Sequence, residues 1–133
     1  MIAEARDGAK RIRIPYSEKQ TMTDAVQDCK RMFTSDTLPE DLRELVNRLG
    51  YHDDAGMMAL MMLCFTLSNL WPESFPLSAQ VASDAIQTIT GMEWDKGKAG
   101  RMMKTLRSDG VLECTSEVKP GQRGKASEYR WLW

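Results

Sequence analysis

Apolar side chains in the first half of the chain recur at helical spacing in three successive segments. Residues 23–35 place apolar positions three and four apart, and residues 38–49 do the same before Gly50, a residue type that often ends helices. Residues 54–70 are apolar on nearly every side, which is typical of a helix with packing neighbours all round. We therefore expect three helices, with residues 54–70 as the buried central one.

The second half of the chain alternates short helical and extended patterns. Ser78 stands where it can cap one helix, and the glycine-rich segment PGQRG separates two runs with strand character. The expected elements, in chain order, are a short strand (75–77), a helix (78–90), a helix (98–109) and two strands (111–118 and 127–133).

A chain of 133 residues is long enough for one compact core, so we expect a single folding unit with three parts. Residues 1–20 have little apolar periodicity and are interpreted as a flexible arm, whereas residues 21–53 form an N-terminal helical region. Residues 54–133 form the third part, whose first helix, 54–70, also serves the helical region. The expected fold class is mainly α with a small β-hairpin.

The junction between the helix at 98–109 and the strand that follows carries the most specific motif. It reads Leu106-Arg107-Ser108-Asp109-Gly110-Val111-Leu112, in which Gly110 suits a left-handed helix end. This junction, the stretch KAGRMMKTLRSDGVLE around it and the ending RGKASEYRWLW resemble the winged helix-turn-helix family over about the last 80 residues. The resemblance implies N-terminal helices packed on a C-terminal winged helix, a recognition helix at 98–109 and a wing at 119–127.

The predicted recognition helix divides into an apolar arc and a polar arc at about 100° per residue. The apolar arc consists of Ala99, Met102, Met103 and Leu106, and the polar arc of Lys98, Arg101, Lys104, Thr105 and Ser108. A helix that lies in a major groove needs this division, because one face packs and the other contacts bases and phosphates. Arg101 can pair bidentately with guanine, whereas Lys98 and Lys104 suit phosphates.

Charge also divides the chain, although its net charge is only −1. Residues 95–133 hold nine basic and five acidic side chains, whereas residues 1–94 hold nine basic and fourteen acidic ones. A basic end favours a polyanion as partner. In the predicted wing, Lys119, Arg123 and Lys125 can approach a phosphate backbone or the minor groove, although a solvated turn also favours glycine and charge.

The sequence contains no pattern typical of a catalytic site, a metal site or a membrane-spanning segment. The single histidine, His52, has no convergent nucleophile, and Cys29, Cys64 and Cys114 lack the paired spacing of a zinc site. The apolar stretch 57–65 is too short to cross a bilayer, and the amino terminus lacks a signal-peptide pattern. We expect a cytoplasmic protein that is not an enzyme and uses no cofactor or metal.

The aromatic residues near the predicted DNA-binding region have structural interpretations. Trp94, in the turn before the helix at 98–109, can stack on the core or on a partner. Trp131 and Trp133 alternate with Leu132, so they share one face of a strand and are expected to pack.

These observations predict a protein that binds double-stranded DNA in a replication or transcription system. The ending GKASEYRW is similar in style to the accessory or C-terminal region of primase-type replication proteins of phages or plasmids. A different class stays open, in which a winged-helix adaptor or inhibitor docks its acidic N-terminal half onto a basic protein. Met32, Phe33 and the apolar face of residues 38–49 that includes Leu42 need to be covered. A homodimer would cover them, as would packing against residues 54–70.

Overall fold

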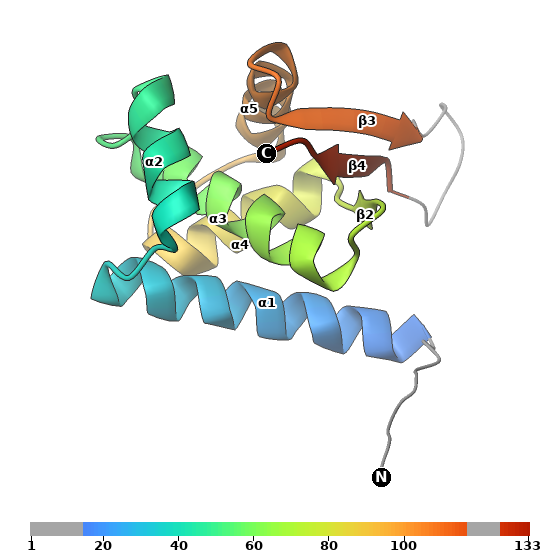
Figure 1. Ribbon diagram of the computed structural model, residues 1–133. Coiled ribbons are helices and arrows are strands. Elements are labelled where there is room, and N and C mark those ends of the chain that lie inside the picture. The colour runs from blue at the N-terminus through green and yellow to red at the C-terminus, as the bar shows by residue number, and fades with distance from the viewer. Residues whose placement is uncertain (1–14, 117–125) are drawn as a thin grey trace, which may run out of the picture.

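The computed structural model describes the backbone of residues 15–116 and 126–133, and side chains from residue 21 onward. These residues form five helices and a small three-stranded antiparallel sheet near the C-terminus (Figure 1). The helices are α1 (Pro15–Ser35), α2 (Glu40–Leu49), α3 (Ala55–Leu70), α4 (Ala79–Thr90) and α5 (Lys96–Ser108). The strands are β2 (Phe75–Pro76), β3 (Leu112–Ser116) and β4 (Glu128–Trp131). The mainly helical class is confirmed.

Helix α3 is the centre of the fold, as its sequence predicted. α1, α2, α4 and two strands of the sheet all pack against it, and every residue from Ala59 to Cys64 is buried. Asp54 caps the helix, because its carboxylate accepts a hydrogen bond from the Met57 N–H at 3.0 Å. Each large apolar side chain buried here stabilises the fold by about 1.5–3 kcal/mol.

Helix α1 begins earlier than the sequence analysis placed it. The flexible arm was expected to reach residue 20 and the helix to start at Thr23, but residues 15–20 are already helical. Proline is well suited to a first helical turn, since its φ angle is helical and its missing N–H would have no intrahelical acceptor there. Residues 1–14 lie outside the described residues.

Helix α2 packs against α3 as well. Its apolar face, Leu42, Leu45 and Val46, is buried, and Gly50 ends it in the left-handed conformation with φ of 81°. Either a homodimer or residues 54–70 were expected to cover this face, and within one chain it packs against α3.

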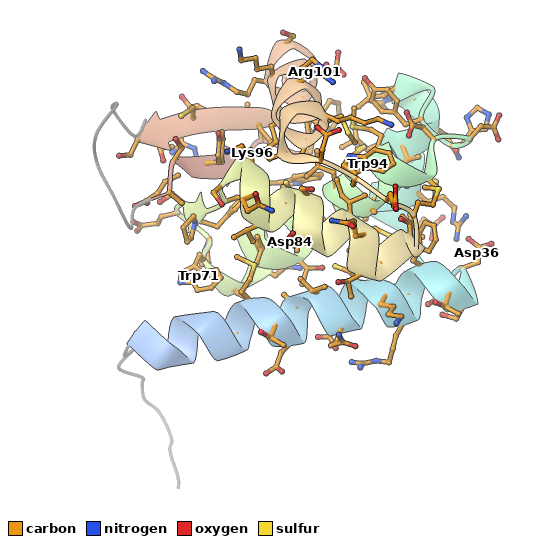
Figure 2. All side chains as sticks on the ribbon, turned by 180° about the vertical axis from the view of Figure 1, so that it is seen from behind. Asp36, Trp71, Asp84, Trp94, Lys96 and Arg101 are labelled. Carbon is orange, nitrogen blue, oxygen red and sulfur yellow. The ribbon has the colours of Figure 1, made fainter. Side chains whose placement is uncertain are left out.

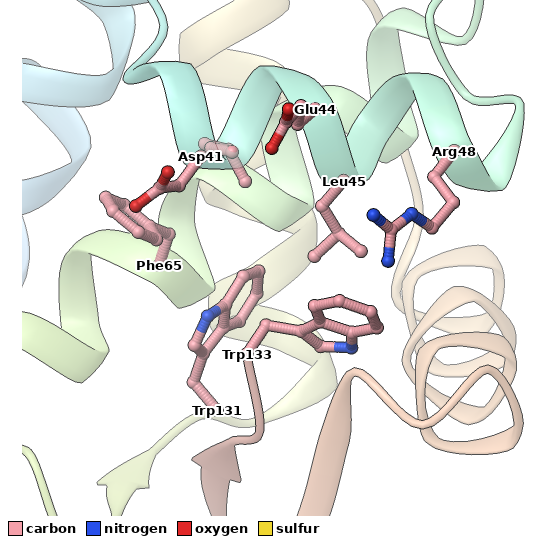
Figure 3. Close-up of a pocket in the computed structure, with 8 residues that line it drawn as sticks. Asp41, Glu44, Leu45, Arg48, Phe65, Trp131 and Trp133 are labelled. Carbon is pink, nitrogen blue, oxygen red and sulfur yellow. The ribbon is translucent and has the colours of Figure 1, made fainter.

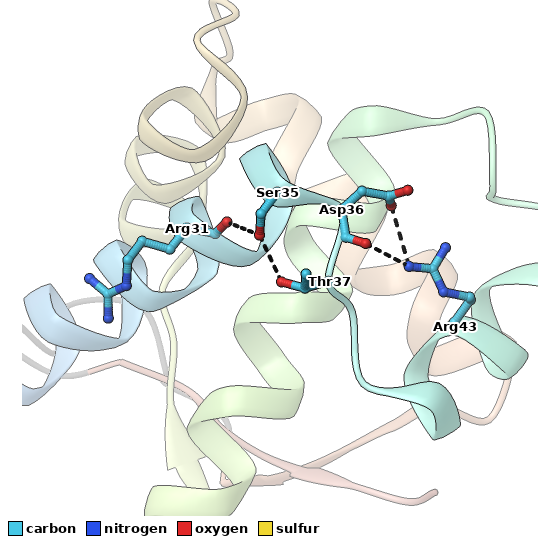
Figure 4. A network of polar contacts seen from close by, with 5 residues as sticks. All are labelled: Arg31, Ser35, Asp36, Thr37 and Arg43. Carbon is cyan, nitrogen blue, oxygen red and sulfur yellow. Dashed lines mark hydrogen bonds and ion pairs between the residues drawn. The ribbon is translucent and has the colours of Figure 1, made fainter.

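A polar network fixes the short connection between α1 and α2 (Figure 4). Asp36 has a left-handed backbone with φ of 56°, which is uncommon for a residue other than glycine. The Arg43 guanidinium donates to the Asp36 carbonyl at 3.1 Å and to its carboxylate at 3.3 Å. Ser35 donates to the Arg31 carbonyl at 2.7 Å and lies 2.8 Å from the Thr37 hydroxyl oxygen. The network compensates for the strained backbone.

The sheet has the strand order β2-β4-β3, so that the short early strand joins the C-terminal hairpin. Phe75 pairs with Tyr129, and their rings lie 6.4 Å apart between centroids. On the other side of β4, Cys114 also pairs with Tyr129, and Glu113 forms a cross-strand ion pair with Arg130. The expected hairpin is present with shorter strands than predicted, and β2 adds a third strand to it.

Candidate nucleic-acid interface

Helix α5, the predicted recognition helix, begins at Lys96 and not at residue 98. Asp95 is its N-cap: the residue is extended and its carboxylate accepts a hydrogen bond from the Lys98 N–H at 2.8 Å. The sequence analysis treated the segment before Lys98 as a turn, and so it did not count Lys96 among the residues of this helix.

The end of α5 forms as the junction motif predicted. Gly110 is left-handed with φ of 78°, and the Val111 N–H donates to the Leu106 carbonyl at 2.9 Å. This long return bond satisfies a carbonyl that the last helical turn leaves open. It also turns the chain so that Val111 and Leu112 are buried and β3 starts beside the helix. The motif therefore sets the angle between α5 and the sheet.

The two faces of α5 differ as predicted. Ala99, Met103 and Leu106 are buried, and Met102 is half-buried against the core. The exposed residues include every predicted contact on this helix together with two further cations: Lys96, Lys98, Arg101, Lys104, Thr105, Arg107 and Ser108. Figure 2 shows α5 at the surface of the molecule, with Arg101 labelled on it. Five basic residues and no acidic one lie within the helix.

The acidic residues at the two ends of α5 are both engaged. Asp95 caps the helix, and Asp109 accepts a hydrogen bond from the Tyr51 hydroxyl at 2.7 Å. Burial, together with the Asp109 carboxylate, raises the pKa of Tyr51 to about 12, so that the hydroxyl keeps its proton and remains the donor. The cationic face of α5 is thus flanked by carboxylates that already have hydrogen-bonding partners.

Trp94 anchors the turn between α4 and α5 to the start of α3. A Cβ atom placed on Gly56 would lie 2.2 Å from the Trp94 ring, so the indole occupies the space that a side chain would need. Its N–H points to the Met102 sulfur at 3.3 Å, and the Lys98 ammonium lies 3.9 Å from its ring centroid. Trp94 therefore packs on the core, and Lys98 is held by it. Gly56 was missed by the sequence analysis.

An open groove of about 660 Å³ lies between α5 and the sheet. Its lining combines cations from α5 with the outer face of the hairpin: Lys104, Arg107, Ser108, Leu112, Glu113, Cys114 and Leu132. Glu113 in this groove is neutralised by Arg130. The predicted wing contacts Lys119, Arg123 and Lys125 lie outside the described residues.

The remaining reactive side chains are dispersed. Burial raises the pKa of Cys29 to about 11 and raises that of Cys64 further, which keeps both thiols protonated and inert. His52 and Asp53 form an exposed pair at 3.3 Å. Within the described part of the chain, no three His, Cys, Asp or Glu residues gather as metal ligands.

Comparison with models of protein families, with curated proteins and with solved structures found no match to this chain. None of the described helices combines the length and the apolar character that crossing a bilayer requires.

Proposed function

We propose that this chain is a winged helix-turn-helix protein that binds double-stranded DNA, with α5 in the major groove and the β3–β4 hairpin beside it. The order α3, β2, α4, α5, β3, β4 supports the fold, because it is the order of elements that the sequence predicted for residues 54–133. The turn at Gly110 and the buried Val111 after it support the fold as well, since they seat the hairpin next to the helix.

The observation that carries the DNA proposal is the exposed face of α5, which presents five bases and no acid. Phosphates supply most of the affinity of such an interface, and lysine and arginine are the side chains that neutralise them. Asp95 and Asp109 flank the two ends of α5, whereas the helix between them carries no acidic side chain that would oppose a polyanion.

Within this face, Arg101 is the proposed base-reading residue. Its planar fork can pair with O6 and N7 of guanine, a contact worth about 1–3 kcal/mol of discrimination. The Thr105 hydroxyl donates to the Arg101 carbonyl at 3.1 Å, which leaves its oxygen free to accept from a base amino group. Lys98, Lys104 and Ser108 are assigned to phosphates, and the sequence-based expectation that Lys119, Arg123 and Lys125 contact the DNA backbone is kept as part of the proposal.

We place this activity in a replication or transcription system of a phage, plasmid or other mobile element, where the protein serves as a DNA-binding component. The support is the similarity of the chain's ending to accessory regions of primase-type replication proteins. No cofactor or metal is assigned to it.

Fluorescence-anisotropy titration of a random-sequence duplex over a salt series tests the proposal. The apparent affinity should fall linearly with salt on logarithmic axes, with a slope of about −0.9 for each phosphate that the protein neutralises. In the variant R101A/K104A the slope should become shallower by about one for each phosphate that is no longer neutralised. The matched control is K30A/R31A, which removes the same two residue types from exposed positions on α1.

Equal weakening of affinity in R101A/K104A and K30A/R31A would mean that net charge, and not α5, controls binding. Absence of binding at low salt would reject DNA as the partner of this chain. The alternative of a protein-binding winged helix is favoured by a separate observation. Residues 21–94 carry eleven acidic and four basic side chains, and this excess suits a basic protein partner.

A further inference from the structure

A cavity of about 210 Å³ opens between α2, α3 and the end of β4 (Figure 3). Its walls are unusual for a small surface cavity, because aromatic rings and charged side chains meet in it. The lining residues are Asp41, Leu42, Glu44, Leu45, Arg48, Phe65, Trp131 and Trp133. None of them belongs to α5, so this aromatic-acidic pocket is distinct from the proposed DNA-binding face.

Three aromatic rings form the apolar wall of the pocket. Trp131 packs edge-on against Phe65, with 5.8 Å between ring centroids, as its predicted packing role required. Trp133 differs from the prediction, since 58% of its surface is exposed although it borders the same cavity. The strand ends at Trp131, and the Leu132 N–H donates one further backbone hydrogen bond to the Val111 carbonyl at 2.9 Å. An exposed tryptophan beside a cavity is characteristic of a binding surface.

Two carboxylates stand at the other wall. Asp41 and Glu44 are three residues apart on α2, so their side chains project from neighbouring turns of one face (Figure 3). Both are exposed, and neither has a hydrogen bond or ion pair with any described residue. By contrast, Asp36 is paired with Arg43, and Asp28 of α1 is paired with Arg31. The negative charge in the pocket therefore remains available to a ligand.

Arg48 shows that this pocket accommodates a guanidinium. Its guanidinium carbon lies 5.1 Å from the centroid of a Trp133 ring, a cation–π distance. Asp41 and Arg48 are seven residues apart, so they stand about two helical turns, roughly 10 Å, from one another along α2. Arg48 thus occupies one end of the pocket, and Glu44 lies one helical turn before it (Figure 3). The far end, with Asp41, Phe65 and Trp131, lacks a cation among the lining residues that the structure describes.

We propose that the aromatic-acidic pocket binds an arginine side chain presented by a protein partner. A guanidinium can stack on an indole ring while its N–H groups reach carboxylates, and lysine lacks this planar combination. A partner protein is the source that charge favours, because α2 and α3 supply six of the eight lining residues and belong to residues 21–94, where eleven side chains are acidic and four are basic. The pocket takes up the inserted side chain, and the surrounding acidic surface attracts the basic protein that carries it.

The probe is the blocked pentapeptide Gly-Gly-Arg-Gly-Gly, titrated into the ¹⁵N-labelled full chain while the four tryptophan indole N–H signals are followed by NMR. The neutral control is the same peptide with citrulline in place of arginine. We expect saturable shifts of the Trp131 and Trp133 signals with the arginine peptide alone. Trp71 and Trp94 do not line the pocket, so their signals serve as internal references for the fold.

Removing the two carboxylates tests which groups recognise the peptide. In D41N/E44Q the affinity for the arginine peptide should fall about fivefold, as expected for two exposed charge contacts next to aromatic rings. The matched variant D53N/E73Q makes the same two changes at exposed positions outside the pocket and should bind like the unaltered chain. Unchanged Trp71 and Trp94 signals in each variant establish that it is folded.

Three results would overturn the proposal. The first is the absence of any shift at Trp131 and Trp133. The second is an equal response to the arginine and citrulline peptides, which would assign binding to the peptide backbone. The third is an equal fall in affinity in D41N/E44Q and D53N/E73Q, which would assign it to net charge. None of these results bears on DNA binding by α5, so the two proposals fail separately.

Discussion

Because Gly56 is in contact with the Trp94 ring, we predict that Gly56→Ala destabilises the protein, although glycine-to-alanine changes normally stabilise a helix. Gly56 is the second residue of α3, and a Cβ atom there would lie 2.2 and 2.4 Å from two carbons of the Trp94 six-membered ring. Real Cβ atoms do not approach ring carbons so closely. Gly56→Ala must therefore push the indole away from the start of α3, and with it the turn that leads into α5.

Two opposing terms set the magnitude. Replacing glycine with alanine inside a helix gains about 0.5–1 kcal/mol from backbone entropy. Forcing a methyl group into filled space costs about 1–3 kcal/mol, and here the obstacle is a rigid ring held by Met102 and Lys98. The cost exceeds the gain, so the free energy of unfolding of G56A should be about 1–2 kcal/mol lower, with Tm lower by roughly 3–8 °C.

Urea and thermal unfolding of four variants measure this effect. Gly100→Ala is the matched control, because its Cβ would meet only the Ala79 methyl at 3.8 Å and should stabilise α5 by the usual helix term. In a double-mutant cycle, G56A should no longer be destabilising when Trp94→Ala has already removed the ring. A cost for G56A that is equal with and without the indole would refute the steric explanation.

Two further predictions concern the loops on either side of α2. Tyr51, whose ordinary pKa of 10.0 is raised to about 12, holds its proton more tightly when folded, so its contribution to stability is complete below pH 10 and disappears as the pH approaches 12. Y51F should therefore lose less unfolding free energy than the unaltered chain between these pH values; equal losses would contradict this. Because Asp36 is left-handed, urea unfolding should find D36G more stable than D36A by about 1 kcal/mol, and equal stabilities would argue against backbone strain there.

Local chemistry explains which elements could be predicted from the sequence. The starts of α3 and α4 depend on Asp54 and Ser78, whose side chains accept from backbone N–H groups three residues later. The return after α5 depends on Gly110, since only glycine readily adopts its backbone angle. The two faces of α5 follow from the helical period. All of these determinants lie within a few residues of the feature that they specify.

The features that escaped prediction depend on residues far apart in the chain. No local pattern shows that the space above Gly56 belongs to Trp94, because their proximity is created by the packing of α4 on α3 and of α5 on α4. The aromatic-acidic pocket joins Asp41 to Trp133 in the same way. At the N-terminus, Pro15 was interpreted as part of an arm, although proline also suits a first helical turn. Periodicity identifies a face but not the residue that covers it.

The two proposed binding sites carry opposite charges, so one chain would bind two partners of opposite charge at separate places. The cations of α5 suit phosphates, and Asp41 and Glu44 suit a guanidinium, while no described residue lines both places. DNA and an arginine-bearing partner would then not compete for the same side chains, and their sites would interact through long-range charge. An arginine at the pocket would offset negative charge that repels the duplex, so each ligand should favour the other, and salt should weaken this coupling because it screens charges beyond about 10 Å. A steric connection would instead persist at high salt, which separates a shared electrostatic field from a conformational link.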